Sequence, residues 1–346
     1  MDQLNKKSIT LDDFVIIRLL GKGEYGKVLL VQKKDTKQLY AMKILKKRLI
    51  QEKNQVNHTL SERSALQRSK HPYIVQLHYA FHNTKNLYMV LEYCPGGEMY
   101  FHLNKFRRFP ENRSKFYSAC IILALQYLHN QQIVYRDLKP ENIVIDAEGF
   151  PKLTDFGLCK ENMSKTDLTR TVCGTPEYIA PEIILRQGHG LAVDWWSLGC
   201  IVYEMLVGQP PFYVEDRREI YKRIIQNRVN VPSGVNPAAA DLIGQLLVKD
   251  PRMRLGAGGG EDVMKHPWFA DIDWALLENR RIRPPFVPNI NNPMDPAYFC
   301  DEFTFTPVVE SPGAMGSPGQ PSSQTFKGFS YNGSNDSGVM ELDMDI

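Results

Sequence analysis

The residues with the clearest chemical potential lie in an octapeptide at positions 135–142, Tyr-Arg-Asp-Leu-Lys-Pro-Glu-Asn. It brings a carboxylate, an ammonium group and an amide close together, at Asp137, Lys139 and Asn142. Such a set suits phosphoryl transfer, in which a carboxylate accepts a hydroxyl proton, a lysine meets phosphate and an amide oxygen meets Mg²⁺. The alternative interpretation is a charged turn between two core elements, because an apolar helical run at 121–128 precedes it and an apolar strand at 143–145 follows it.

A second carboxylate, Asp155, ends a predicted strand and opens the sequence Asp-Phe-Gly. Together with Asn142 it offers oxygen ligands of the kind that a hard ion such as Mg²⁺ prefers. Residues 160–175 are polar and rich in Thr and Ser, which predicts a mobile loop. The chemistry is therefore expected where two short strands end and such a loop begins.

A glycine-rich turn near the N-terminus, Gly-Lys-Gly-Glu-Tyr-Gly at 21–26, lies between two predicted strands. Glycine lets backbone N–H groups approach phosphates because it has no Cβ. The pattern alone is weak, since dinucleotide-binding folds also use it. In those folds it opens a helix, whereas residues 27–32 here continue as a strand. We therefore interpret the turn as a flap over ATP.

Lys43 lies in an apolar predicted strand at 39–45 and needs a partner to justify its partial burial. Glu62, in a predicted helix at 55–67, is the candidate. Another strand at 86–93 runs into the connector Cys-Pro-Gly-Gly at 94–97, which predicts a hinge. Glu98 follows at a predicted helix start. It either belongs to the functional site or simply stabilises the helix through its negative charge.

Bulk properties fit a soluble intracellular enzyme of 346 residues with two units of ordinary domain size. The net charge of +3 gives no argument for nucleic acid or an anionic membrane. Six scattered cysteines indicate reduced thiols in a cytoplasmic or nuclear protein. The polar N-terminus lacks a signal peptide, and no apolar stretch is long enough to span a bilayer.

The composition changes after residue 271. Prolines prevent regular helix between 284 and 296, and residues 311–323 form a Ser/Pro/Gly linker. The aromatic island Phe-Lys-Gly-Phe-Ser-Tyr at 326–331 is expected to dock on the folded domain. The final residues, 332–346, are acidic and predict a solvated end.

Taken in order, these motifs resemble the signature set of the protein kinases. The resemblance covers residues 14–269, and Tyr135 in place of the commoner histidine is typical of the AGC group. In the tail, Phe299 with the Glu-Phe pair at 302–303 resembles the active-site tether, Ser311 the turn motif and 326–331 the hydrophobic motif. Cys300 stands where relatives carry an acidic residue. Within that group, the chain resembles protein kinase B, the serum- and glucocorticoid-regulated kinases and the ribosomal-protein S-six kinases, and the motifs do not choose among them.

The resemblance implies an α+β, bilobal kinase fold. A short extension at 1–13 would precede a β-rich N-lobe at 14–93 and a helical C-lobe at 94–269. The regulatory tail would occupy 270–341 and the acidic end 342–346. Such an extension leaves no room for the lipid-binding domain of protein kinase B, so phosphoinositide recruitment is not expected.

The implied cofactors are ATP and Mg²⁺. Asp137 would be the catalytic base, Lys139 would steady the γ-phosphate, Lys43 would pair with Glu62, and Asn142 and Asp155 would bind the metal. The remaining nucleotide-binding residues would be Leu20, Gly21, Lys22, Gly23, Glu24, Tyr25, Gly26, Lys27, Val28, Ala41, Leu91, Glu92, Cys94, Glu98, Val144 and Thr154.

The resemblance also implies regulation by phosphorylation at Thr171, Ser311 and Ser330. His58, Arg136 and Lys160 would pair with the phosphate on Thr171, which adds nearly two negative charges. Phospho-Ser330 would dock the tail on the N-lobe near Lys47 and Leu87 and recruit an upstream kinase of the phosphoinositide-dependent type.

Substrates would be proteins with Ser or Thr in arginine-rich motifs, read by Glu98, Glu141 and Glu204. We expect a monomer active in signalling. Two alternatives remain at this point: a nucleotide-binding pseudokinase, opposed by the intact catalytic set, and a small-molecule kinase, which would have no use for the Thr171 loop and aromatic tail.

The resemblance further implies structural roles for three residues of the C-lobe and for a hydrophobic spine. Asp194 would hold the backbone of the octapeptide, and Glu182 would pair with Arg254. The hydrophobic spine that stacks in an active kinase would comprise Leu66, Leu77, Tyr135 and Phe156.

Overall fold

The computed structural model describes residues 9–164, 167–171, 173–304 and 323–333. These residues form two compact units. The small unit contains the described parts of 1–63, 76–93 and 300–346, and the large unit contains 64–75 and 94–299. The α+β, bilobal fold class is thus confirmed, with β-structure concentrated in one unit and helices in the other.

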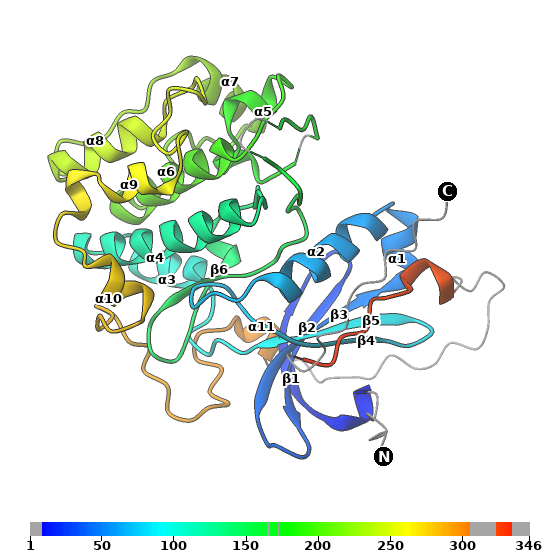
Figure 1. Cartoon of the computed structure of the whole chain (residues 1–346). Coiled ribbons are helices and arrows are strands. Elements are labelled where there is room, and N and C mark those ends of the chain that lie inside the picture. Colours follow the sequence, from blue (N-terminus) through cyan, green and yellow to red (C-terminus); the bar gives the residue numbers. More distant parts are fainter. Residues whose placement is uncertain (1–8, 165–166, 172, 305–322, 334–346) are drawn as a thin grey trace. The chain divides into compact units, whose positions relative to one another are not determined.

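The small unit is built on a five-stranded antiparallel sheet with strand order β1-β2-β3-β5-β4 (Figure 1). The strands are β1 Phe14–Lys22, β2 Gly26–Lys33, β3 Leu39–Lys46, β4 Leu77–His82 and β5 Asn86–Glu92. Apolar side chains such as Leu29, Val31, Met42 and Val90 are completely buried on it. Burial of these β-branched and aliphatic residues stabilises the sheet.

Three α-helices accompany the sheet within the small unit: α1 Lys47–Glu52, the first part of α2 Val56–Arg68, and α11 Asp301–Thr304. Helix α11 packs on β1, and Phe303 contacts the core of the sheet. The 3₁₀ turns Leu11–Asp13 and Ser323–Phe326 complete the regular structure. The described tail residues 301–304 and 323–333 therefore belong to the small unit.

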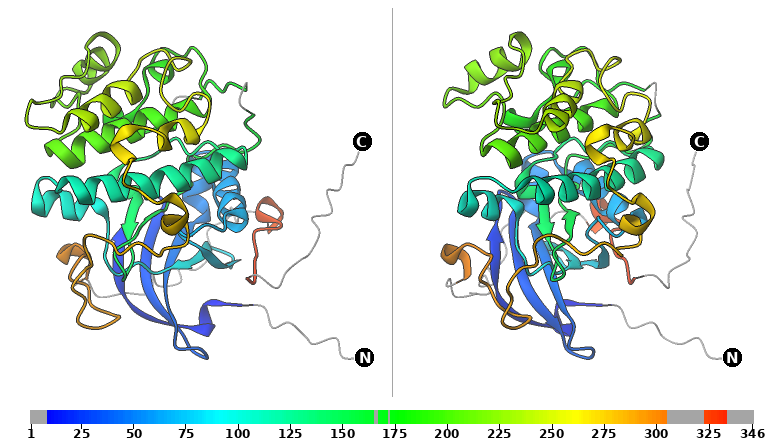
Figure 2. Two further views of the ribbon diagram at one scale, coloured as in Figure 1. Left: turned by 60° about the vertical axis from the view of Figure 1, so that its left-hand side comes forward. Right: turned by 90° about the vertical axis from the view of Figure 1, so that its left-hand side faces the viewer.

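The large unit is organised around α4 Glu111–Asn130 and α6 Ala192–Val207, which pack on each other (Figure 2). Most residues of both helices are buried. Helix α6 ends where Gly208 adopts a left-handed conformation with φ of +102°, a C-terminal arrangement for which glycine is favoured. The other helices of this unit are α3 Met99–Phe106, α5 Pro181–Ile184, α7 Arg217–Gln226, α8 Pro237–Leu246, α9 Gly260–Met264 and α10 Trp274–Glu278, with 3₁₀ turns at Pro140–Asn142, Pro176–Tyr178 and Pro267–Phe269.

A two-stranded hairpin, β6 Ile143–Ile145 and β7 Pro151–Leu153, carries the chemistry-bearing loops of the large unit. Val75 N–H donates to Leu153 O, which joins residues 64–75 to this hairpin. The proline-rich stretch up to Phe299 also packs on the large unit, where a Cβ on Gly97 would lie 2.1 Å from Tyr298 O. Packing groups residues 64–75 and 270–299 with the large unit, and the described residues 300–304 and 323–333 with the small unit.

Within the described ranges, no helix combines the length and apolar character needed to cross a membrane.

Candidate functional site

Asp194 fixes the backbone of the octapeptide at 135–142. One of its carboxylate oxygens accepts a hydrogen bond from Arg136 N–H at 2.8 Å. The other accepts from Tyr135 N–H at 2.9 Å and contacts Nε2 of His129 at 2.8 Å. Arg136 has a φ of +66°, a strained conformation that costs about 1–3 kcal/mol and persists only where the surroundings enforce it. Asp194, which is completely buried, supplies that enforcement.

Asp137 lies at the centre of a short polar network in the large unit. Nδ2 of Asn142 donates to Asp137 Oδ2 at 2.8 Å, and Nζ of Lys139 lies 3.0 Å from the same oxygen. Thr175 Oγ1 donates to Asp137 Oδ1 at 3.2 Å and accepts from Lys139 Nζ at 3.0 Å. The structure therefore brings the predicted acid, cation and amide together. It adds Thr175, whose role the sequence reasoning missed and whose position directly before Pro176 was the available signal.

The two predicted metal ligands lie at the ends of the β6–β7 hairpin. Asn142 ends the 3₁₀ turn before β6, Asp155 follows β7, and Thr154 N–H donates to Asn142 O at 2.9 Å between them. Asp155 has a φ of +56° and its Oδ1 accepts from Gly157 N–H at 3.3 Å. The described residues contain no group of three or more His, Cys, Asp or Glu side chains able to hold a metal. A carboxylate and an amide fit Mg²⁺, which binds through few protein ligands together with substrate phosphates.

The small unit contains the predicted Lys43–Glu62 pair. Nζ of Lys43, on β3, donates to Glu62 Oε1 of α2 at 2.6 Å. Glu62 is 3% exposed, so its charge is compensated by this pair in a poorly solvated place. The arrangement fixes an ammonium group on the sheet, opposite Val28 in the β2–β3 register.

The glycine-rich turn joins β1 to β2 as predicted. Gly23 and Gly26 exchange backbone hydrogen bonds of 2.9 and 3.4 Å. A Cβ on Gly26 would lie 1.8 Å from Ile44 O, so this glycine is required for packing. A Cβ on Gly21 or Gly23 would meet nothing within 4 Å. That space fits the close approach of phosphates to backbone N–H groups.

The other predicted nucleotide-binding residues occur on both units. On the small unit, Ala41 of β3 faces Leu91 of β5 in the strand register. On the large unit, Glu98 forms an isolated bridge with Val144, Thr154 follows β7, and Cys94 is buried in the connector before Glu98. The remaining members lie in or beside β1, β2 and β5: Leu20, Lys22, Glu24, Tyr25, Lys27, Val28 and Glu92.

The three carboxylates predicted to bind arginine, Glu98, Glu141 and Glu204, lie in the large unit, and burial together with the charge of Glu141 raises the pKa of the other two. Burial, followed by the charge of Glu141, raises the pKa of Glu98 to about 7. Burial also raises the pKa of Glu204 to about 7, although the Tyr178 hydroxyl, which donates to it at 2.6 Å, opposes the shift. Oε2 of Glu141 is buried without a hydrogen-bond partner among the described residues. Glu98 makes no side-chain cap at the start of α3, which weakens the purely structural alternative.

The activation segment is the loop at 160–175 that carries Thr171, and the structure describes all of it except residues 165, 166 and 172. Thr171 is exposed, while Lys160 Nζ donates to Thr169 Oγ1 at 2.9 Å. Arg136 is buried beneath the segment and donates through Nε to Leu158 O at 2.7 Å. His58 belongs to the small unit, where its Nδ1 contacts Gln55 Oε1 at 2.6 Å. The structure therefore places Arg136 and Lys160 in one unit and His58 in the other.

The aromatic island docks on the small unit, as expected. Phe326 and Phe329 are completely buried, and Tyr331 pairs with Ala80 through two backbone hydrogen bonds of 2.7 and 2.9 Å. Lys47 Nζ lies 5.2 Å from the centre of the Phe326 ring.

Ser330 is exposed within this docked segment, and its carbonyl accepts a hydrogen bond from NH2 of Arg63 at 3.0 Å. Arg63 was not anticipated from the sequence. Cys300 is exposed before α11. Ser311 and the acidic end, residues 342–346, lie outside the described residues.

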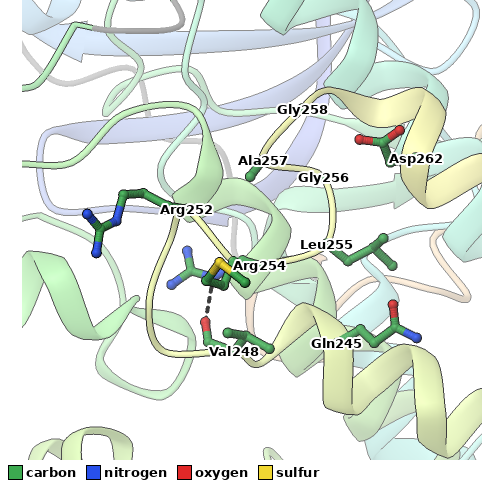
Figure 3. A pocket seen from close by; sticks show the side chains of 10 residues that line it. Gln245, Val248, Arg252, Arg254, Leu255, Gly256, Ala257, Gly258 and Asp262 are labelled. Atoms are coloured by element: carbon green, nitrogen blue, oxygen red, sulfur yellow. Dashed lines mark hydrogen bonds between the residues drawn. The ribbon is translucent and has the colours of Figure 1, made fainter.

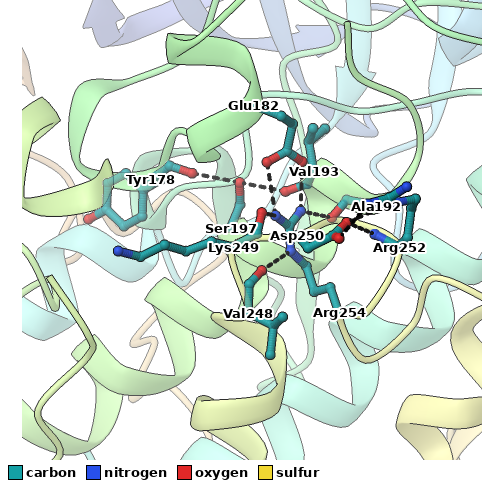
Figure 4. A network of polar contacts seen from close by, with 10 residues as sticks. All are labelled: Tyr178, Glu182, Ala192, Val193, Ser197, Val248, Lys249, Asp250, Arg252 and Arg254. Atoms are coloured by element: carbon teal, nitrogen blue, oxygen red, sulfur yellow. Dashed lines mark hydrogen bonds and ion pairs between the residues drawn. The ribbon is translucent and has the colours of Figure 1, made fainter. Parts of the chain in front are cut away.

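A buried ion pair supports the large unit. Arg254 donates through NH1 and NH2 to the two oxygens of Glu182 at 2.8 and 2.9 Å, as the resemblance implied (Figure 4). The guanidinium also donates to Val248 O and Ala192 O, so each of its three nitrogens has a hydrogen-bond acceptor. Tyr135 and Phe156, two of the expected spine residues, contact edge to face with ring centres 5.2 Å apart.

Two cavities in the large unit lie away from the catalytic network. One of about 340 Å³ is lined by the loop between α8 and α9, including Arg252, Arg254 and Gly258 (Figure 3). A second of about 630 Å³ lies between the start of α4 and the segment before α8. Neither cavity is lined by Asp137 or Asp155. The candidate site is therefore identified by the hydrogen bonds around Asp137 and not by a cavity.

Comparisons with known proteins agree with this geometry. The family described as "Protein kinase domain" matches residues 14–269. The chain is 46% identical over 332 residues to "Protein kinase 2" of Dictyostelium discoideum, covering 94% of this chain and 68% of that protein. It is 45% identical over 331 residues to a "RAC family serine/threonine-protein kinase homolog" of the same organism, covering 94% of this chain and 74% of that protein. It is 44% identical over 309 residues to the human "RAC-beta serine/threonine-protein kinase", covering 89% of this chain but 64% of that longer protein. The chain belongs to the protein kinase family, as a serine/threonine protein kinase of the AGC group.

Proposed function

We propose that this chain transfers the γ-phosphate of ATP to serine or threonine in arginine-rich protein segments. The observation that carries the proposal is the network around Asp137. Its carboxylate is held by Asn142 and Thr175, within reach of Lys139. A fixed carboxylate suits the acceptance of the substrate hydroxyl proton, and the adjacent ammonium group suits the transferring phosphoryl group.

ATP and Mg²⁺ are the cofactors of this proposal. Asn142 and Asp155 would hold the metal, and Gly21, Gly23 and Lys43 would hold the phosphates. When bound, the metal would neutralise charge on the β- and γ-phosphates. The chain's own contribution is to fix these side chains, through the Lys43–Glu62 pair in one unit and the β6–β7 hairpin in the other.

Arginine preference is supported by the carboxylates Glu98, Glu141 and Glu204. Two of them have a pKa near 7 because burial disfavours their charge. A guanidinium is always charged and forms two parallel hydrogen bonds with a carboxylate, so it restores the ionised state better than a neutral residue.

Activation would follow phosphorylation of Thr171, Ser311 and Ser330, with an upstream kinase of the phosphoinositide-dependent type docking on the tail. The buried contacts of Phe326 and Phe329 support a regulatory tail that engages the small unit. We further propose that the protein acts as a monomer in the cytoplasm, and also in the nucleus, as part of a signalling pathway.

The test is transfer of labelled γ-phosphate to an Arg-x-Arg-x-x-Ser peptide and to the same peptide without arginine. Asp137→Asn should lower kcat by about 10²–10⁴ because general-base catalysis contributes that much. Asp241→Asn, on the exposed side of α8, is the matched control and should leave kcat unchanged. Equal, measurable rates for Asp137→Asn and wild type would refute the catalytic role of Asp137. No transfer by the wild-type protein would favour a nucleotide-binding pseudokinase. Equal rates on the two peptides would refute only the arginine preference.

A further inference from the structure

A basic cluster beneath the activation segment, formed by Arg136, Lys160 and His189, has unused hydrogen-bonding capacity. NH1 of Arg136 and Nε2 of His189 are buried and find no partner among the described residues. Arg136 is 6% exposed and His189 is 2% exposed. Buried polar groups in folded proteins are nearly always paired, so two orphans in one place require an explanation.

Backbone pairing brings the three basic residues together within the large unit. Lys160 exchanges two backbone hydrogen bonds with Val134, two residues before Arg136. Thr169 exchanges two with His189, each of 2.9 Å, and its hydroxyl accepts from Lys160 Nζ. The catalytic loop, the segment after Asp-Phe-Gly and the segment before α6 thus meet at this cluster.

Within the described part of the chain, the carboxylates that act on His189 are already bound to other groups. The carboxylates that act on His189 are Glu182 and Asp194. Glu182 binds both terminal nitrogens of Arg254, and Asp194 holds Tyr135 N–H, Arg136 N–H and His129. Burial, followed by the charge of Arg136, lowers the pKa of His189 to about 4, with Lys160 acting in the same direction. The imidazole is therefore neutral at pH 7 and lies next to two cations.

We propose that His189 binds the phosphoryl group placed on Thr171, together with Arg136 and Lys160, and so acts as a positioning residue of the activation switch. This inference rests on the proposed activation by phosphorylation. Thr171 is exposed and accessible to another kinase, and it follows Thr169 by two residues, a span of at most about 7 Å. Thr169 itself is buried and already bonded to Lys160.

Phosphorylation of Thr171 would place a negative charge beside the basic cluster. A phosphothreonine carries nearly two negative charges at pH 7. A negative charge beside an imidazole favours its protonated form, so phosphorylation should raise the pKa of His189 and let Nε2 donate to a phosphate oxygen. Both orphan donors would then be satisfied by one group.

The test compares wild type, His189→Phe and His189→Gln, with His71→Gln as the matched control. His71 has a pKa lowered to about 4 by burial, as His189 does, but it lies beside Lys152 rather than Arg136. Each full-length protein is phosphorylated by an upstream kinase, and mass spectrometry verifies phosphate on Thr171. The readouts are the rate of phosphate removal by a phosphatase and the rise in Tm on phosphorylation, at pH 6, 7 and 8.

A phosphatase reaches mainly the undocked phosphothreonine, so its rate reports the undocked fraction. Loss of one hydrogen bond to a charged group should make removal about tenfold faster in His189→Phe. His189→Gln keeps a donor and should be intermediate. The rise in Tm on phosphorylation should be larger in wild type than in His189→Gln, and this difference should grow as the pH falls from 8 to 6. A purely structural role of His189 would not produce that pH dependence. If His189→Phe fails to fold, this pH dependence decides the question.

Wild-type rates and Tm shifts in both His189 variants, matching His71→Gln, would refute the role of His189 while leaving kinase activity and Thr171 activation intact. Absence of phosphate on Thr171 in active wild-type protein would instead overturn the proposed activation, and the inference with it.

Discussion

Substitution of Asp194 by asparagine tests whether one buried carboxylate holds the catalytic loop. In wild type, one oxygen accepts from Arg136 N–H, and the other serves Tyr135 N–H and His129. Asparagine can keep the second oxygen and its two donors. Its NH2 group would then face the N–H of Arg136, so two donors would oppose each other in a site that is 0% exposed.

The expected cost follows from these contacts. One hydrogen bond to a charged acceptor is lost, worth about 1.5–3 kcal/mol, and a buried donor is left unpaired at roughly 1–3 kcal/mol. We therefore expect the free energy of unfolding to fall by about 3–5 kcal/mol, a large share of the 5–15 kcal/mol typical of a folded domain. The strained φ of Arg136 loses its support, so kcat should fall as well.

Urea denaturation followed by intrinsic fluorescence measures the stability, and peptide phosphorylation measures kcat. Asp241→Asn is the matched control, because Asp241 also contacts a histidine, His266 at 3.1 Å, but is 61% exposed. An exposed pair contributes about 0–1 kcal/mol. If Asp194→Asn costs no more than Asp241→Asn and leaves kcat unchanged, the assignment of Asp194 as the support of this loop is wrong.

Two further predictions concern the substrate and nucleotide regions. Because the pKa values of Glu98 and Glu204 are raised to about 7, both groups are charged above that pH and protonated below it. KM for an arginine-containing peptide should therefore rise about tenfold per group between pH 8 and pH 6, and Glu98→Gln should keep only the rise due to Glu204. A KM that does not change with pH in the wild-type protein would contradict this. Gly26→Ala should destabilise the protein by about 1–3 kcal/mol or more, because the new Cβ would lie 1.8 Å from a backbone oxygen. Gly21→Ala should instead preserve stability and raise KM for ATP. Thermal unfolding and ATP titration test this, and a larger loss of stability in Gly21→Ala than in Gly26→Ala would contradict the steric argument.

Much of the fold and of the catalytic set could be predicted from the sequence, because both depend on local patterns. Short apolar runs predicted strands such as β3, β5 and β6, and the apolar helical run at 121–128 predicted part of α4. Asp137, Lys139 and Asn142 are close in sequence, so a single loop brings them together wherever it lies. Lys43 and Glu62 required a pairing argument, and the structure joins them at 2.6 Å.

Contacts between distant segments could not be predicted in this way. Thr175 reaches Asp137 across 38 positions, and Arg63 reaches the tail at Ser330 across 267. No local periodicity records such pairs, since they depend on how loops return to the core. The assignment of 64–75 and 270–299 to the large unit has the same origin.

The sequence by itself determined which residues could perform phosphoryl transfer and on which elements they would lie, because residue type and spacing constrain local conformation. Only the tertiary structure decided which of their polar atoms are satisfied and which are not. The buried carboxylate of Asp194 is saturated by three donors, whereas Nε2 of His189 is left without one among the described residues. That difference depends on packing in three dimensions, where the removal of water makes each missing partner costly.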